Sequence, residues 1–180
     1  MKNMFLKTIG GAALAILMLA VFAQVQVSAQ DNNTEEKTDE QTQEDSAMRR
    51  SNTRALEGVW DIQVTRRNCT TGAVISTFAA MHTFMRGGTM IDWGTGSLPS
   101  LRSPGQGIWY YESRRQYSSA FQFFRYNADG TLAGKQIGRG QIELSHDGNS
   151  YSTTGMGQVL DINGNVIATN CNTSTATRFQ

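Results

Sequence analysis

The stretch Leu56–Cys69, LEGVWDIQVTRRNC, decides how this 180-residue chain folds. After its glycine, apolar Trp60, Ile62 and Val64 alternate with polar residues, which is the pattern of a strand with one buried face. Runs rich in Val, Ile, Phe, Tyr and Thr follow to the C-terminus, with no apolar period long enough for a helix. The sequence therefore predicts an all-β domain.

Turn signals divide this domain into eight strands. Asp-Gly, Asn-Gly and Gly-Gly pairs, which supply the positive φ angles of tight hairpins, separate most of the runs. The expected strands are 57–67, 74–85, 89–93, 107–113, 116–126, 131–145, 150–160 and 165–178. The one longer connection, residues 94–107, holds both prolines. Sequential antiparallel strands form a flat meander, a sandwich or a closed up-and-down barrel, and only closure removes both open edges.

The residues ahead of the barrel carry two other signals. Lys2 and Lys7 accompany the apolar run IGGAALAILMLAVFA, and small residues end at Ala29, as in a cleaved signal peptide over 1–29. A membrane anchor is the alternative, for which the run is short. Residues 30–51 are acidic with almost no apolar side chains, so we expect a disordered linker; an acidic interaction tail is the other possibility. The barrel domain then spans 52–180, and the product is exported.

The two ends of the domain test whether the barrel closes. In an antiparallel pair of strands, the residue numbers of facing residues add up to nearly the same value along the whole pair. This value differs by only two between the pair Trp60–Arg178 and the pair Cys69–Cys171. One register with at most a bulge accommodates both contacts. Cys69 and Cys171 are the only cysteines, and an exported chain favours their pairing over free thiols or an intermolecular bridge. We predict a closed eight-stranded antiparallel barrel, with Trp60 plugging one end beneath the guanidinium of Arg178.

Several motifs resemble those of a known family. GVW at the start of the first strand and TRF at the end of the last resemble the Gly-x-Trp motif and terminal Arg of the lipocalin (calycin) superfamily. SPGQGIW, FQFFRYNADG and NCNTSTATRF look like exported bacterial lipocalin-like β-barrel proteins of unknown function. The resemblance implies a bacterial source and a secreted or periplasmic location. In contrast to ordinary lipocalins, the longest loop falls between the third and fourth strands and no helix is expected after the barrel.

Few residues suit metal or haem binding. His146 lies in the turn SHDGNS, where exposure explains it. His82 shares the parity of Phe78 and Phe84, which favours an inward-facing core or rim histidine over a haem ligand. DINGN and NADG have the spacing of calcium-loop fragments but lack the distal carboxylate, so we expect hairpin turns. We predict no metal and no cofactor.

Catalysis and nucleic-acid binding also find little support. No Gly-x-Ser-x-Gly elbow occurs, and both cysteines are expected in the disulfide. Asp92, Glu112 and Glu143 are acid–base candidates only if the interior shifts their pKa values, so no catalytic residue is assigned. Basic residues exceed acidic ones by three in 51–180, too mild a balance for a nucleic-acid partner.

The barrel interior is the best candidate site, because eight strands can enclose one small ligand or fill the space with side chains. We expect a cavity for an apolar or aromatic ligand beneath the 94–107 loop, with two arginines available for an anionic head group. The expected ligand-binding residues are Phe78, Met81, Trp93, Trp109, Tyr117, Phe121, Phe123, Arg102 and Arg125. A packed core is the alternative.

Three functions compete. The first is an exported small-molecule-binding barrel without a stable membrane anchor after signal cleavage. The second is a protein-interaction or inhibitor module with a filled barrel. The third is a barrel enzyme such as a cyclase or isomerase. A cavity above about 300 Å³ favours the first or third, and a buried carboxylate with a raised pKa favours the third. The sequence does not indicate an oligomeric state.

Overall fold

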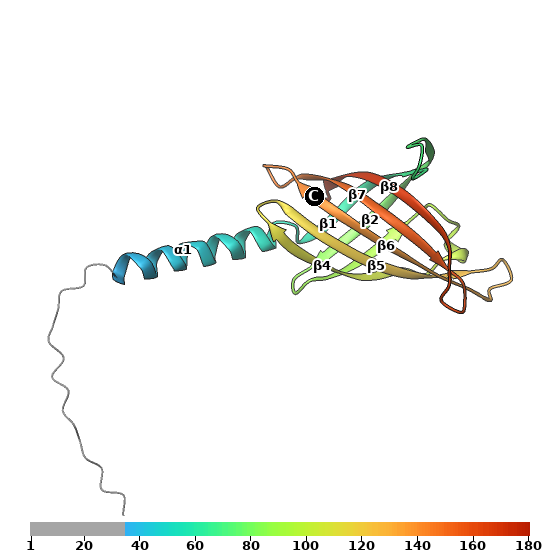
Figure 1. The fold of residues 1–180 in the computed structure, drawn as a ribbon, viewed down its shortest axis with the longest axis horizontal. Helices are drawn as coiled ribbons and strands as arrows, with labels where there is room; N and C mark the ends of the chain where they lie inside the picture. The colour runs from blue at the N-terminus through green and yellow to red at the C-terminus, as the bar shows by residue number, and fades with distance from the viewer. Residues whose placement is uncertain (1–34) are drawn as a thin grey trace, which may run out of the picture.

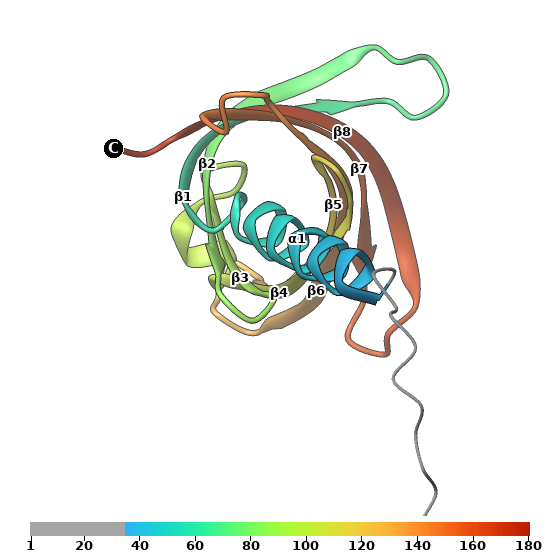
Figure 2. The same ribbon diagram turned by 90° about the vertical axis from the view of Figure 1, so that its left-hand side faces the viewer.

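The computed structural model describes residues 35–180 and shows a helix leading into a closed barrel of eight antiparallel strands (Figure 1). Each strand pairs with its neighbours in sequence, and the last pairs with the first, so the predicted up-and-down barrel is confirmed. The elements are α1 (Glu35–Arg54), β1 (Gly58–Arg67), β2 (Val74–Met85), β3 (Thr89–Gly94), η1 (Pro99–Leu101), β4 (Gly105–Ser113), β5 (Gln116–Tyr126), β6 (Leu132–Leu144), β7 (Ser150–Leu160) and β8 (Val166–Arg178). Figure 2 shows the strands as a ring around the barrel axis.

One unbroken register joins β1 to β8. Trp60 lies opposite Arg178, and Arg67 lies opposite Cys171. Cys69, two residues beyond the end of β1, forms the predicted disulfide with Cys171 across a sequence separation of 102 residues. The covalent bond and the hydrogen-bonded ladder therefore close the ring at the same seam.

The hairpins close through the turn residues that the sequence marks. Gly130 in NADG and Gly164 in DINGN have φ angles of 82° and 87°, in the left-handed region that favours glycine. The Asp161 carboxylate accepts backbone N–H bonds from Asn163 and Asn165 at 2.9 and 2.8 Å. Both segments are hairpin turns, and the Asp161 carboxylate stabilises the second of them.

The barrel end next to α1 is closed by a hydrophobic core. Trp60, Leu56, Tyr117 and Phe84 are fully buried there. The Trp60 indole N–H donates to the Leu56 carbonyl at 3.0 Å, and the Arg178 guanidinium carbon lies 4.2 Å from the centroid of the indole ring. Arg178 also donates to the main-chain carbonyls of the segment that enters β1 and of the β6–β7 turn, at Ala55, Glu57 and Gly148. The indole therefore plugs this end of the barrel.

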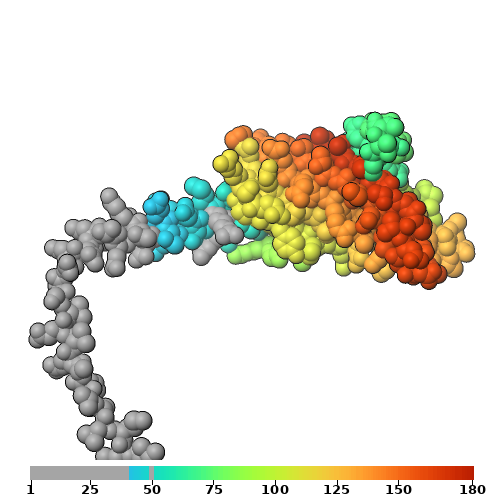
Figure 3. Space-filling view, viewed as in Figure 1, coloured from blue at the N-terminus to red at the C-terminus, as the bar shows by residue number. Residues whose placement is uncertain are grey.

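The segment ahead of the barrel differs from the sequence expectation. Residues 30–51 were expected to lack secondary structure, whereas Glu35–Arg54 is helical. The segment contains no Gly or Pro and is rich in Glu and Gln, which favour helix, and Arg54 lies in the last turn, where a cation complements the helix dipole. Residues 41–48 are exposed, and the helix meets the barrel near its end, where the Tyr117 hydroxyl donates to the Asn52 carbonyl. Figure 3 shows the blue atoms of residues 41–48 beyond the end of the barrel.

The remainder of the predicted linker and the predicted signal peptide, residues 1–34, lie outside the described residues. Within residues 35–180, none of the helices is long and apolar enough to cross a membrane.

Candidate functional site

A cavity of about 110 Å³ lies inside the half of the barrel remote from α1. Phe78, Phe121 and Phe123 supply its aromatic lining, and the rest is largely Ser, Thr, Asn, Gln, Arg and Gly. Gly138 makes room for Phe121, because a Cβ at that position would lie 2.6 Å from the phenyl ring. The inward-facing glycines therefore create space against which the aromatic rings pack.

Four of the nine predicted ligand-binding residues line this cavity: Phe78, Phe121, Phe123 and Arg102. Trp109 and Tyr117 face inward but are buried in the core at the closed end, away from the cavity lining. Arg125 is half-buried outside the lining, and its backbone bridges that of Arg102.

Met81 and Trp93 face outward, contrary to the expectation that they line the interior. They lie opposite each other across the β2–β3 pair and are 47% and 44% exposed. Side chains alternate along a strand, and the inward positions of β2 and β3 are occupied by residues such as His82 and Asp92. The expectation included apolar residues from alternating positions of the same strand, although alternate positions of a strand point to opposite faces of the sheet. Met81 and Trp93 instead line an outer hollow of about 620 Å³ over β1, β2, β3 and β8.

A buried hydrogen-bonded network lies at the cavity wall. The β2–β3 hairpin places His82 directly opposite Asp92, and the residues after η1 bring in Arg102. His82 Nε2 lies 3.1 Å from Asp92 Oδ1, and its Nδ1 lies 3.2 Å from the Tyr151 hydroxyl oxygen. Arg102 donates from Nη2 to Asp92 Oδ2, and its guanidinium carbon lies 3.8 Å from the centroid of the Phe123 ring. Both carboxylate oxygens of Asp92 are therefore occupied.

The titration of this network follows from its surroundings. Burial raises the pKa of the Asp92 carboxyl, but the hydrogen bond from His82 and the charges of His82 and Arg102 outweigh burial and hold that pKa below its ordinary value. Burial, with the nearby Asp92 charge, raises the pKa of the Tyr151 hydroxyl, which stays protonated at neutral pH. Asp92 is thus an ionised, fully bonded carboxylate, which suits it to fix Arg102 in place and does not favour general acid–base catalysis.

Replacing Asp92 with Asn is expected to lower the free energy of unfolding at neutral pH by about 2 kcal/mol, because the buried Arg102 guanidinium loses its counter-charge. The pKa of Asp92 is lower in the folded chain than in the unfolded chain, so its stabilisation is present above about pH 4 and is lost as pH falls through the folded pKa. The stability gap between the wild-type protein and D92N should therefore shrink below about pH 4 in denaturant titrations.

Glu143→Gln is the matched control, because Glu143 is an exposed carboxyl on the outer wall. It should change stability by less than about 0.5 kcal/mol. A gap for D92N that stays constant down to about pH 3 would contradict the assigned role of the Asp92 charge.

The other acid–base candidates do not join this network. Glu112 and Glu143 are exposed on the outside, where Glu112 accepts a hydrogen bond from Ser118. Within residues 35–180, no three His, Cys, Asp or Glu side chains gather closely enough to hold a metal ion.

Apart from Arg102, sequence reasoning missed the polar residues of the lining. Arg66 follows Trp60, Ile62 and Val64 at even positions of β1, so strand parity alone could have placed it inside. The His82–Asp92 pair also had a signal, because the Gly-Gly turn between β2 and β3 fixes a register in which the two residues face each other. Arg102 was expected in the lining, but its pairing with Asp92 had no such signal, because Arg102 reaches the cavity from an irregular connection.

Comparisons with known proteins identify no family for this chain. No protein-family model matches the chain, and no curated protein matches it. One similar solved structure is described as "De novo design of transmembrane beta-barrels"; it has a TM-score of 0.47 and 16% sequence identity and covers 68% of this chain and 97% of that chain. So distant a likeness carries no argument about function.

Proposed function

We propose that this chain is an exported, lipocalin-like barrel that binds one small molecule in its interior. The observation that supports this function is the cavity of about 110 Å³, in which aromatic rings and hydrogen-bonding side chains face the same space. The closed end is filled by Trp60 and its neighbours, so a ligand enters from the half remote from α1.

The size of the cavity limits the ligand. Pockets that enclose drug-sized molecules measure about 300–1,000 Å³, so this interior is too small to enclose a fatty acid or haem. The interior is also smaller than an apolar cavity of about 150 Å³ that holds benzene. The ligand class we propose is therefore no larger than a single small ring or a short chain.

Export is supported by the disulfide, since such bonds persist in oxidising compartments. The location we propose is extracellular or periplasmic, in a bacterium.

Two alternatives have weaker support. An interaction or inhibitor module is the second candidate, because the interior is smaller than the about 300 Å³ of a pocket that encloses a drug-sized ligand. The outer hollow beside Met81 and Trp93 is a specific observation in its favour. A barrel enzyme is disfavoured by Asp92, whose pKa is lowered and whose two oxygens are already bonded.

Filling the cavity should weaken binding at least about tenfold without unfolding the protein. Gly140 lines the cavity, and a Cβ there would meet its nearest neighbour, the Thr154 carbonyl oxygen, at an ordinary 3.4 Å. Gly140→Val should therefore place two methyl groups in the ligand space and weaken binding of a small aromatic probe at least about tenfold, with a stability change within about 1 kcal/mol. Isothermal titration calorimetry with a panel of small aromatic and aliphatic probes measures this.

The matched control is Gln141→Val, which adds the same side chain at the next, outward-facing position of β6. It should leave probe affinity unchanged. Absence of saturable binding to the wild-type protein across the panel, or equal binding to G140V, would contradict an interior ligand site.

A further inference from the structure

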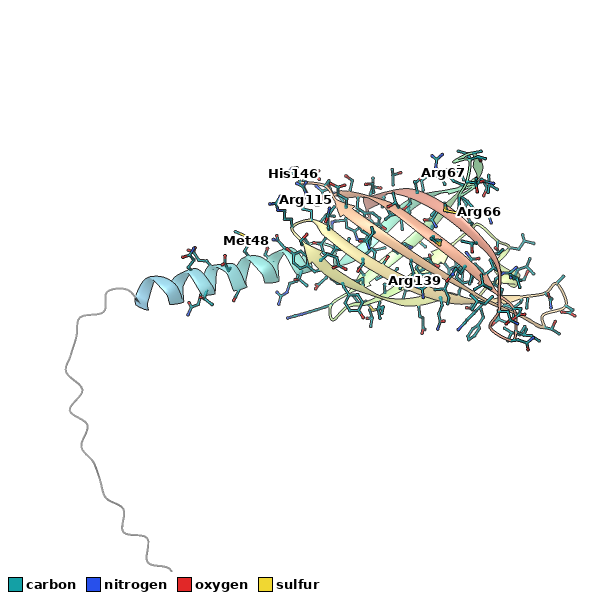
Figure 4. The ribbon with its side chains drawn as sticks, viewed as in Figure 1. Met48, Arg66, Arg67, Arg115, Arg139 and His146 are labelled. Atoms are coloured by element: carbon teal, nitrogen blue, oxygen red, sulfur yellow. A yellow bond between two sulfur atoms is a disulfide. The ribbon has the colours of Figure 1, made fainter. Side chains whose placement is uncertain are left out.

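The cavity carries an excess of positive charge. Among its lining residues the sole acid is Asp92, and this carboxylate forms an ion pair with Arg102. Arg66 and Arg139 also line the cavity. Arg139 is exposed and donates to Gln158 on the outer wall, whereas Arg66 faces inward from β1. Figure 4 shows Arg66 near the barrel end remote from α1.

Arg66 is an inward-facing cation that has no counter-charge among residues 35–180. Its Nε and Nη2 atoms both donate to the Ser76 hydroxyl, each at 3.1 Å, and the side chain is half-buried. Within residues 35–180, the structure gives Arg66 no carboxylate partner within 4.0 Å. Arg102, which the sequence suggested as the anchor for an anionic head group, is already paired with Asp92.

The neighbours of Arg66 complete a site for an anion with a small apolar part. Asn172 lies directly opposite Arg66 on β8 and also lines the cavity, so an amide that can donate hydrogen bonds is at the same depth. On β2, Phe78 is one inward position deeper than Ser76, a step of about 7 Å. A head group at Arg66 therefore places an attached ring or short chain against Phe78 and Phe121.

We propose that the ligand is a small organic monoanion whose carboxylate is bound by the Arg66 guanidinium and whose apolar part packs against Phe78 and Phe121. This inference rests on the interior binding site proposed above and adds the chemical class of the ligand. Guanidinium and carboxylate form charge-assisted, often bidentate hydrogen bonds, and these strengthen where water is partly excluded.

The test compares two probes of nearly the same shape, benzoate and benzamide, by calorimetry and by NMR of the arginine Nε–Hε signals. Benzoate should bind the wild-type protein at least about tenfold more tightly than benzamide, and it should shift the Arg66 Nε–Hε signal. Arg66→Gln should weaken benzoate binding at least about tenfold and leave benzamide within about twofold.

Arg67→Gln is the matched control, because Arg67 is the next residue of β1 and donates instead to Thr173 and the Gly72 carbonyl. R67Q removes the same charge and should leave the affinities of both probes unchanged.

One outcome would overturn the anionic class while leaving the interior site intact. In it, benzoate and benzamide bind equally well, R66Q changes neither affinity, and G140V weakens binding of both. If neither probe binds the wild-type protein, the inference and the proposed interior site both fail. If R66Q does not fold, the difference in affinity between benzoate and benzamide for the wild-type protein, together with the shift of the Arg66 Nε–Hε signal, still tests the proposal.

Discussion

Replacing both Cys69 and Cys171 with serine is expected to lower the free energy of unfolding by about 4–5 kcal/mol. The disulfide joins residues separated by 102 positions, and closing so long a loop removes much of the entropy of the unfolded chain. Cys69 is exposed and Cys171 half-buried, so serine costs little packing. Guanidinium titrations of the oxidised wild-type protein and the double variant, followed by circular dichroism, measure the difference.

Treating the wild-type protein with a reducing agent is the control, because it breaks the same bond without changing a residue. The reduced protein should match the double variant and should still form a barrel, since the β1–β8 ladder does not depend on the sulfur atoms. A loss of less than about 1 kcal/mol in both samples would contradict the prediction that the seam depends strongly on this bond.

Replacing Trp60 with Ala is expected to cost about 3–5 kcal/mol, the range of large aromatic-to-alanine changes in packed cores. The indole is fully buried, its ring centroid lies 4.8 Å from that of Tyr151, and Arg178 covers it. Its removal therefore leaves a void beneath a guanidinium and also deletes the N–H bond to Leu56. Denaturant titration followed by circular dichroism is the measurement, because the fluorescence changes with the residue.

Trp93→Ala is the matched control, since Trp93 is the same residue type on the outer wall and is 44% exposed. It should cost less than about 1 kcal/mol. Similar losses for the two variants would contradict the assignment of Trp60 to the plug at the closed end.

The architecture could be predicted because it depends on local turn residues and on the alternation of apolar and polar residues along each strand. Turn residues placed the strand ends within two residues of those observed, and the residue-number sums of two distant pairs predicted the β1–β8 seam. A hairpin depends on its own turn, and an antiparallel register needs only one known contact to fix every other.

The candidate site could be predicted only in part because it depends on which face each residue takes and on contacts outside the ladder. Phe78, Phe121 and Phe123 were expected in the lining and are found there, whereas Met81 and Trp93 were chosen for their apolarity and face outward. The pairing of Arg102 with Asp92 depends on the path of the η1 connection, which no periodicity encodes. The helical form of α1 was missed because the expectation considered burial alone and not intrinsic helix propensity.

The direction in which α1 leaves the barrel has a practical consequence for surface attachment. The helix departs from the end sealed by Trp60 and spans 20 residues, about 30 Å at 1.5 Å per residue. A bead, resin or reporter joined ahead of Glu35 would therefore sit behind the sealed end, and the opposite rim would point outward into bulk solution. Immobilised protein should in this orientation remain accessible to small solutes.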